Sequence, residues 1–230
     1  MKIVATTLGE TLGDFLSMTL NLGYAVGIGI TLVFFLLVLI IQSKAKKYTP
    51  IFFWLAIIAT TTLETEVSDF LDRSLHLGYT LGSFVLFSGL IFNLWYKKFK
   101  TLNVYPILDE NKEVYFWIAV LFSNSLGTAF GDYLSDIIGL SYLNGALVTA
   151  GIIVIVFLLH KFTKLNHIIL FWLAFIFTRP FGATFGDFLT KPIAKGGLDL
   201  GTLNASVVSI ILMTILIIIA HRRLKTLELK

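Results

Sequence analysis

Four aspartates recur at regular intervals along a chain that is otherwise strongly apolar. Each is followed by an aromatic residue and a leucine, and the copies lie 55, 63 and 55 residues apart. The four residues are Asp14, Asp69, Asp132 and Asp187. Carboxylate oxygens are preferred ligands of hard divalent cations. The repeated pattern therefore predicts a cation-binding site assembled from equivalent positions of the chain.

Other polar residues share the predicted helix faces of these aspartates. Residues four apart lie along one face of a helix, and the positions four and eight before each aspartate are mostly polar. The predicted metal ligands are Glu10, Asp14, Glu66, Asp69, Asp132 and Asp187. The predicted substrate pathway adds Thr65, Asn124, Thr128, Arg179, Thr184 and Lys191. Clustered carboxylates cannot all ionise without a counter-charge, so we expect proton uptake when the cation leaves, with Arg179 and Lys191 as internal cations beside Asp187.

A purely structural role for the same residues is the competing interpretation. Aspartates near the end of a membrane span can cap a helix or lie among lipid headgroups. Glycines four apart, such as Gly9 and Gly13, let membrane helices pack closely. Four charged residues extend the polar face further along the helices than a cap requires: Glu10, Glu64, Glu66 and Arg179. The second repeat has Glu64 where the others have glycine, so its helix packing is expected to differ.

The composition predicts that membrane-spanning helices position these residues. Hydrophobic residues make up 57% of the 230 residues and charged residues only 14%, against roughly 45–50% and about 25% in soluble domains. Four uncharged stretches reach the roughly 20 residues needed to cross a bilayer as helix: 15–43, 74–96, 137–160 and 200–221. Four interrupted apolar segments are also predicted to span: 3–18, 51–75, 114–135 and 168–190. We therefore predict an all-α polytopic membrane protein with eight transmembrane helices.

These segments are arranged as four tandem helical hairpins. Phe-Trp occurs fifteen residues before each of the last three aspartates, and the tryptophans are Trp54, Trp117 and Trp172. We interpret them as anchors at the membrane interface. The predicted repeats are 1–47, 48–100, 112–163 and 164–224. Because each repeat has two spans, all four enter the membrane from the same side and are parallel. The first repeat lacks the Phe-Trp position, so its first span is short or the natural start lies upstream.

The distribution of charge predicts the orientation. Of the 18 basic residues, all but Arg73, Arg179, Lys191 and Lys195 lie in the segments that join repeats or near the two termini. Loops rich in Lys and Arg stay on the cytoplasmic side. Both termini are therefore predicted to be cytoplasmic, in a bacterial inner membrane. Most of the 14 acids lie in the first helix of each repeat or in the opposite turns.

Three sequence features together resemble a known family: the repeated Gly-x-x-x-Gly-Asp-Phe/Tyr-Leu unit, the Thr-Thr-x-Gly-Glu start at residues 6–10 and the Phe-Trp pairs. The family is a bacterial one of membrane proteins built from four tandem two-helix repeats of unknown function. The resemblance covers essentially the whole chain and implies the fold but little biochemistry. The chain departs from the pattern by lacking the first tryptophan and by having Glu64 in place of a glycine. A fainter similarity, at residues 10–14, is to small cation/proton exchangers for calcium and manganese.

The leading functional hypothesis is a proton-coupled membrane transporter for a divalent cation, such as manganese or another hard metal. One alternative is a proton-coupled carrier of an organic cation or small solute, and another is a non-transport scaffold or sensor. No enzyme and no resident cofactor are predicted, because the chain has no cysteine and its four histidines do not recur at one repeat position. The predicted partners are the lipid bilayer and a small ion or solute, without nucleic acid, and a homo-oligomer is open.

Overall fold

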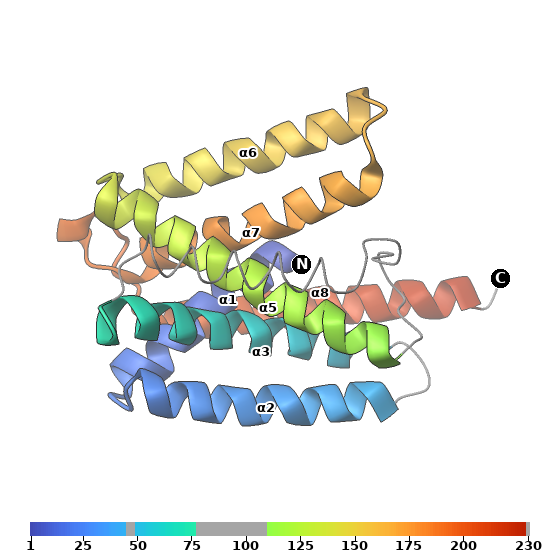
Figure 1. Cartoon of the computed structure of the whole chain (residues 1–230), viewed down its shortest axis with the longest axis horizontal. Coiled ribbons are helices and arrows are strands. Elements are labelled where there is room, and N and C mark those ends of the chain that lie inside the picture. The colour runs from blue at the N-terminus through green and yellow to red at the C-terminus, as the bar shows by residue number, and fades with distance from the viewer. Residues whose placement is uncertain (45–48, 77–109, 229–230) are drawn as a thin grey trace.

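The protein is an elongated bundle of helices (Figure 1). Its computed structural model describes residues 1–44, 49–76 and 110–228. These residues form seven α-helices and no strand, which confirms the all-α class for the described part of the chain. The helices are α1 (Lys2–Asp14), α2 (Tyr24–Lys44), α3 (Pro50–Asp69), α5 (Glu110–Asp132), α6 (Tyr142–Phe162), α7 (His167–Thr190) and α8 (Thr202–Glu228). Most of the predicted span 74–96 lies outside the described residues.

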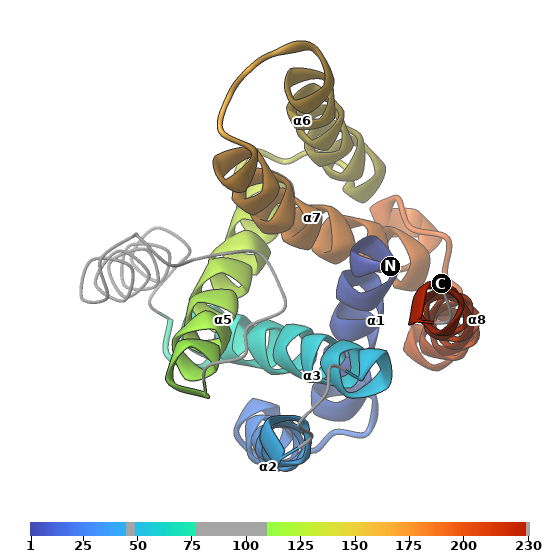
Figure 2. The same ribbon diagram turned by 90° about the vertical axis from the view of Figure 1, so that its right-hand side faces the viewer.

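The four helices that carry the repeated aspartates form a closed ring. Viewed end-on, α1, α3, α5 and α7 surround a common centre, and each contacts the next, with α7 returning to α1 (Figure 2). In the first, third and fourth repeats, the second helix lies outside the ring and packs on the first helix of the following repeat. Thus α2 packs on α3, α6 packs on α7, and α8 packs on α1. This exchange between repeats joins the last repeat to the first and closes the bundle.

The turns that follow the aspartates share a repeated geometry. In three repeats the α-helix ends at the aspartate and continues as a five-residue π-helical turn. These turns are η1 (Phe15–Thr19), η2 (Phe70–Ser74) and η3 (Tyr133–Ile137), whereas α7 is followed by the 3-10 turn η4 (Ile193–Lys195). A left-handed residue then reverses the chain, and it is Asn21, His76, Gly139 or Asp199. All four turns lie at the left end of the bundle in Figure 1, so the aspartates are held near one end.

Close packing of the ring depends on glycine. A Cβ atom added to Gly9 would overlap the Thr61 side chain of α3, and one added to Gly182 would overlap Thr6 of α1. Glycine therefore lets neighbouring helices approach more closely than any other residue would. At the equivalent position of α3 stands Glu64, whose carboxylate instead accepts a hydrogen bond from Asn124 of α5, with an N–O distance of 3.0 Å. The expected difference in packing of the second repeat is confirmed.

An apolar cluster fills the part of the ring furthest from the aspartates. Trp117 is only 2% exposed, and its ring lies 6.0 Å from that of Phe35 on α2 and 5.9 Å from that of Phe53 on α3. The interpretation of Trp117 as an interfacial anchor is therefore wrong. The outer helix of the first repeat covers this side chain, an effect of tertiary packing that the residue's distance from the aspartate does not reveal.

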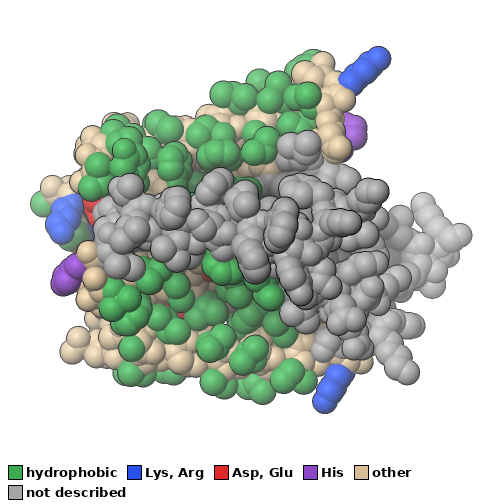
Figure 3. Space-filling view, in the orientation of Figure 1, with side chains coloured by type: hydrophobic (Ala, Val, Ile, Leu, Met, Phe, Trp, Pro, Cys, Tyr) green, Lys and Arg blue, Asp and Glu red, His purple; other side chains and the backbone are tan. Residues whose placement is uncertain are grey.

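The outer helices expose apolar side chains along their length. The visible faces of α2 and α6 are covered with hydrophobic side chains, and Lys and Arg side chains lie at the two ends (Figure 3). Four described helices are long and apolar enough to cross a membrane: Tyr24–Gln42, Pro50–Asp69, Tyr142–Phe162 and Thr202–Arg222. Three overlap uncharged stretches of the sequence, and the fourth, α3, was predicted as an interrupted span. A surface of this kind is typical of a membrane protein.

Candidate functional site

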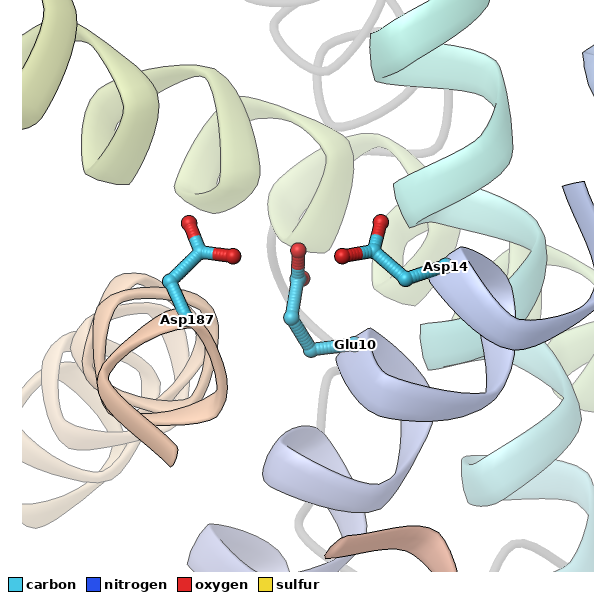
Figure 4. A group of neighbouring side chains, drawn as sticks. All are labelled: Glu10, Asp14 and Asp187. Atoms are coloured by element: carbon cyan, nitrogen blue, oxygen red, sulfur yellow. The ribbon is translucent and has the colours of Figure 1, made fainter. Parts of the chain in front are cut away.

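Three carboxyl groups meet inside the ring. Glu10 and Asp14 lie one turn apart on α1, and Asp187 faces them from α7 (Figure 4). One oxygen from each residue lies within 4.8 Å of the other two, and all three residues are buried. The close approach of α1 and α7 at Gly186, where an added Cβ would lie 2.9 Å from Cβ of Glu10, brings these carboxyl groups together. Three oxygens at this spacing can contribute ligands to one hard cation.

Lys191 reaches into the same site from the turn that follows α7. Its Nζ lies 2.7 Å from Oδ2 of Asp14 and 3.1 Å from Oδ1 of Asp187, and its side chain is 19% exposed. Burial lowers the pKa of Lys191, but the neighbouring carboxylates, Asp187 first, outweigh that effect and raise the pKa above its usual value. The ammonium group is therefore charged and acts as a tethered cation. We call Lys191, Asp14 and Asp187 the Lys191 layer.

Arg179 pairs with acids further from the turns. Its side chain is fully buried, with Nη1 3.1 Å from Oε2 of Glu10 and Nε 3.7 Å from Oε2 of Glu64. Nη2 donates hydrogen bonds to the Thr65 hydroxyl and to the carbonyl of Thr61. One guanidinium thus connects α7 to α1 and α3, as its fixed fork of donors allows. We call Arg179, Glu10, Glu64 and Thr65 the Arg179 layer; Glu10 connects it to the carboxyl groups of the Lys191 layer.

The Arg179 layer continues through Asn124, a predicted pathway residue, to Lys2, which the sequence did not assign to the site. Asn124 donates to Glu64 and accepts a hydrogen bond from Nζ of Lys2 at 3.2 Å. Lys2 also donates to the carbonyl of Phe175 at 2.7 Å. Glu64 was placed on the polar face but not among the predicted ligands, because it replaces a packing glycine, and Lys2 was counted among the basic residues of the membrane boundary. The short α1 begins inside the bundle, with the N-terminus about midway along it (Figure 1).

The other two repeated aspartates do not join the group of three. Asp69 pairs with Arg73, one turn along its own helix, with 3.4 Å between Nε of Arg73 and Oδ1 of Asp69. Asp132 is buried, and its Oδ2 has no hydrogen-bond partner among the described residues. The expectation of four equivalent aspartates around one ion is therefore not met in this arrangement. Asp14 and Asp187 share Lys191, whereas Asp69 pairs with Arg73 and Asp132 is in no described ion pair, and these differences break the fourfold symmetry.

Two further predicted residues point away from the centre of the ring. Glu66 packs against Gly27 of α2, and Thr184 packs against Gly145 of α6. Both lie three residues before an aspartate, and the positions four and eight before it face the neighbouring ring helices. A change of one residue turns the side chain by about 100° around a helix, enough to move it from the ring to the outer helix. Thr128 is buried, and its hydroxyl donates to the carbonyl of Asn124 at 3.4 Å.

Comparison with known proteins identifies the repeat family but assigns no activity to it. A family model described as "Repeat of Unknown Function (DUF347)" matches residues 1–48, 52–101, 115–166 and 170–226. The chain belongs to this family. The four matches confirm the resemblance to proteins with four tandem repeats, and together they include most of every described helix. No curated protein and no solved structure gives a significant match.

Proposed function

We propose that this protein is a membrane transporter for a cation, more specifically a hard divalent cation such as manganese. The observation that carries the proposal is the meeting of Glu10, Asp14 and Asp187 within 4.8 Å inside the ring. Oxygen ligands of this type suit Mg²⁺, Ca²⁺ and Mn²⁺. The ring helices are surrounded by outer helices with apolar surfaces, so a cation held here would be shielded from lipid.

The membrane arrangement belongs to the same proposal. Four parallel hairpins would give eight spans, with both termini in the cytoplasm and the protein in a bacterial inner membrane. Support comes from the common direction of α3, α5 and α7 and from the grouping of the turns after the aspartates at one end (Figure 1). The carboxylates would then be nearer the outer side of the membrane. Loop charge favours this orientation.

Lys191 supports an exchange mechanism. Its ammonium group already pairs with Asp14 and Asp187, so an incoming divalent cation would have to displace it. Partial exposure of the side chain, and its place in a turn rather than in a ring helix, favour displacement towards the turn. When the cation leaves, Lys191 or protons would restore neutrality, which gives a route to proton coupling.

A transport assay on the purified full-length protein in liposomes tests the proposal. Influx of Mn²⁺, Mg²⁺ and Ca²⁺ is measured with an internal indicator, and proton movement with a pH-sensitive dye. We expect flux of at least one ion, and its loss when Asp14→Asn and Asp187→Asn are combined. Asp199→Asn is the matched control, since this exposed residue lies in an outer turn and asparagine tolerates its left-handed backbone. Absence of all cation flux, or full flux in the double variant, contradicts the proposal.

The non-transport scaffold is a second candidate, favoured by the Arg179 layer. A fully buried guanidinium with two carboxylate partners ties three ring helices together whether or not an ion passes. The same assay separates the two functions, because a scaffold would fold stably and carry no flux. A carrier of an organic cation would move the pH dye only when that solute is supplied.

A further inference from the structure

Glu66 is a buried carboxyl group outside the candidate cation site. It is fully buried on α3 and faces α2, where Gly27 leaves room for it; a Cβ atom at Gly27 would overlap its Oε1. Neither carboxyl oxygen makes a hydrogen bond of good geometry with the described residues. The hydroxyl of Thr31, one turn further along α2, is the polar group beside it.

Within residues 1–44, 49–76 and 110–228, no cationic side chain pairs with this carboxyl group. Along α2 there is no charged residue between Tyr24, at its beginning, and Lys44, at its end. On α1 and α3 the acids Glu10, Glu64 and Asp69 are turned towards Arg179, Asn124 and Arg73. Helix α8, which also contacts α3, has no charged residue from Thr202 to Ala220. An isolated ionised carboxylate in such surroundings is very costly, whereas the neutral acid is not.

Equivalent positions of the other repeats show that the fold does not require an acid there. These residues are Thr11, Ala129 and Thr184. Thr11 accepts a hydrogen bond from Ser206 of α8 at 2.9 Å, and Thr184 packs on Gly145 of α6. Both described contacts, at Thr11 and Thr184, are uncharged and join a ring helix to the outer helix of the preceding repeat. The carboxyl group of Glu66 is therefore an addition to an interface that is neutral in the first and fourth repeats.

We propose that Glu66 is a proton-binding site at the interface of α2 and α3, separate from the site of Glu10, Asp14 and Asp187. It holds its proton as a carboxylic acid, and loss of the proton places an uncompensated charge between the two helices. Binding and release of this proton thereby act on the contact between the first and second repeats. The site does not depend on the transport proposal, because it involves none of the residues of the Lys191 layer.

A protonated carboxyl group within a membrane has a diagnostic reaction. Dicyclohexylcarbodiimide is apolar and reaches such groups through the lipid. The acid transfers its proton to a nitrogen of the reagent while its oxygen bonds to the central carbon, and an acyl shift then gives a stable N-acylurea. This is an addition, so no oxidant or leaving group is needed. A carboxylate paired with a cation lacks the proton that the first step uses.

The experiment labels the full-length protein in liposomes and locates the adduct by peptide mass spectrometry. We expect an adduct at Glu66 that declines as pH rises and none at Glu64, two residues away and paired with Arg179 and Asn124. Glu66→Gln and Glu66→Thr should each lose the adduct; threonine stands at this position in the first and fourth repeats. A small soluble carboxylic acid in the same reaction confirms that the reagent is active. No adduct at Glu66 at any pH, or equal labelling of Glu64, overturns the proposal.

Discussion

The Arg179 layer and the Lys191 layer use the same chemistry in different surroundings. Arg179 is fully buried and contacts α1 and α3 through four polar partners, whereas the side chain of Lys191 is 19% exposed and contacts two carboxylates. A buried ion pair is strongly destabilised when one partner is removed, so the Arg179 layer is suited to hold the ring together. The cation of the Lys191 layer is partly exposed. We propose that it can be exchanged, which is the property that a transport site needs.

The largest effect is expected from removing the cation of the Arg179 layer. Arg179→Met leaves Glu10 and Glu64 without their buried partner, and it should cost about 3–5 kcal/mol of folding stability. Thermal unfolding in detergent measures the loss. Adding Glu64→Gln should restore part of the stability, because one of the two uncompensated charges is then gone. If Arg179→Met alone were as stable as the native protein, the Arg179 layer would not hold the ring together, and it would not differ from the Lys191 layer in this respect.

The next largest effect tests whether the ring around the Arg179 layer depends on close packing between α1 and α3. Gly9→Ala places a Cβ atom against Thr61 of α3, and overpacking of this kind costs about 1–3 kcal/mol. The matched control is Gly29→Ala on α2, where no atom lies within 4 Å of an added Cβ. The control should keep or increase stability, since alanine favours helix over glycine by about 1 kcal/mol. Equal unfolding temperatures for the two variants would contradict this packing role.

Lys191→Met tests whether the cation of the Lys191 layer is exchangeable. If its ammonium group competes with a divalent ion for Asp14 and Asp187, its removal should tighten Mn²⁺ binding by about tenfold, which corresponds to about 1.4 kcal/mol. Calorimetric titration of the detergent-purified protein measures the dissociation constant. Lys195→Met, a change at an exposed lysine of η4, should leave it unchanged. Weaker binding in Lys191→Met would mean that the lysine only holds the carboxylates in position.

The smallest effect is expected at the pair of Arg73 and Asp69. The Arg73 side chain is 36% exposed although Asp69 is buried, so its guanidinium is partly hydrated and the pair should contribute less than the fully buried pair of Arg179. Arg73→Gln should therefore change the unfolding temperature far less than Arg179→Met, and the change should shrink further at high salt. A loss of stability as large as that of Arg179→Met would show that solvent exposure does not explain the difference between the two ion pairs.

Much of the helical architecture can be predicted from sequence, because each repeat has the same two apolar segments around the same aspartate. The predicted uncharged stretches at 15–43, 137–160 and 200–221 overlap α2, α6 and α8. The site was predicted less completely. Helical spacing correctly places Glu10 and Asp14 on one face of a helix. It also assigned both Thr65 and Glu66 to the site, although only Thr65 lies in the Arg179 layer. Adjacent residues of a helix point in different directions, and the positions of the neighbouring helices determine which of the two faces the ring.

Sequence alone determined that the chain has four related units, that they are apolar and that each has an acid at one position. Those properties follow from residue type and spacing, which are local. Tertiary structure alone decided that three acids meet while Asp69 and Asp132 remain apart, that Lys2 and Glu64 enter the network, and that Glu66 faces α2. The reason is that each of the outer helices α2, α6 and α8 packs on the next repeat. Contacts between repeats, rather than within one, determine what every charged side chain meets.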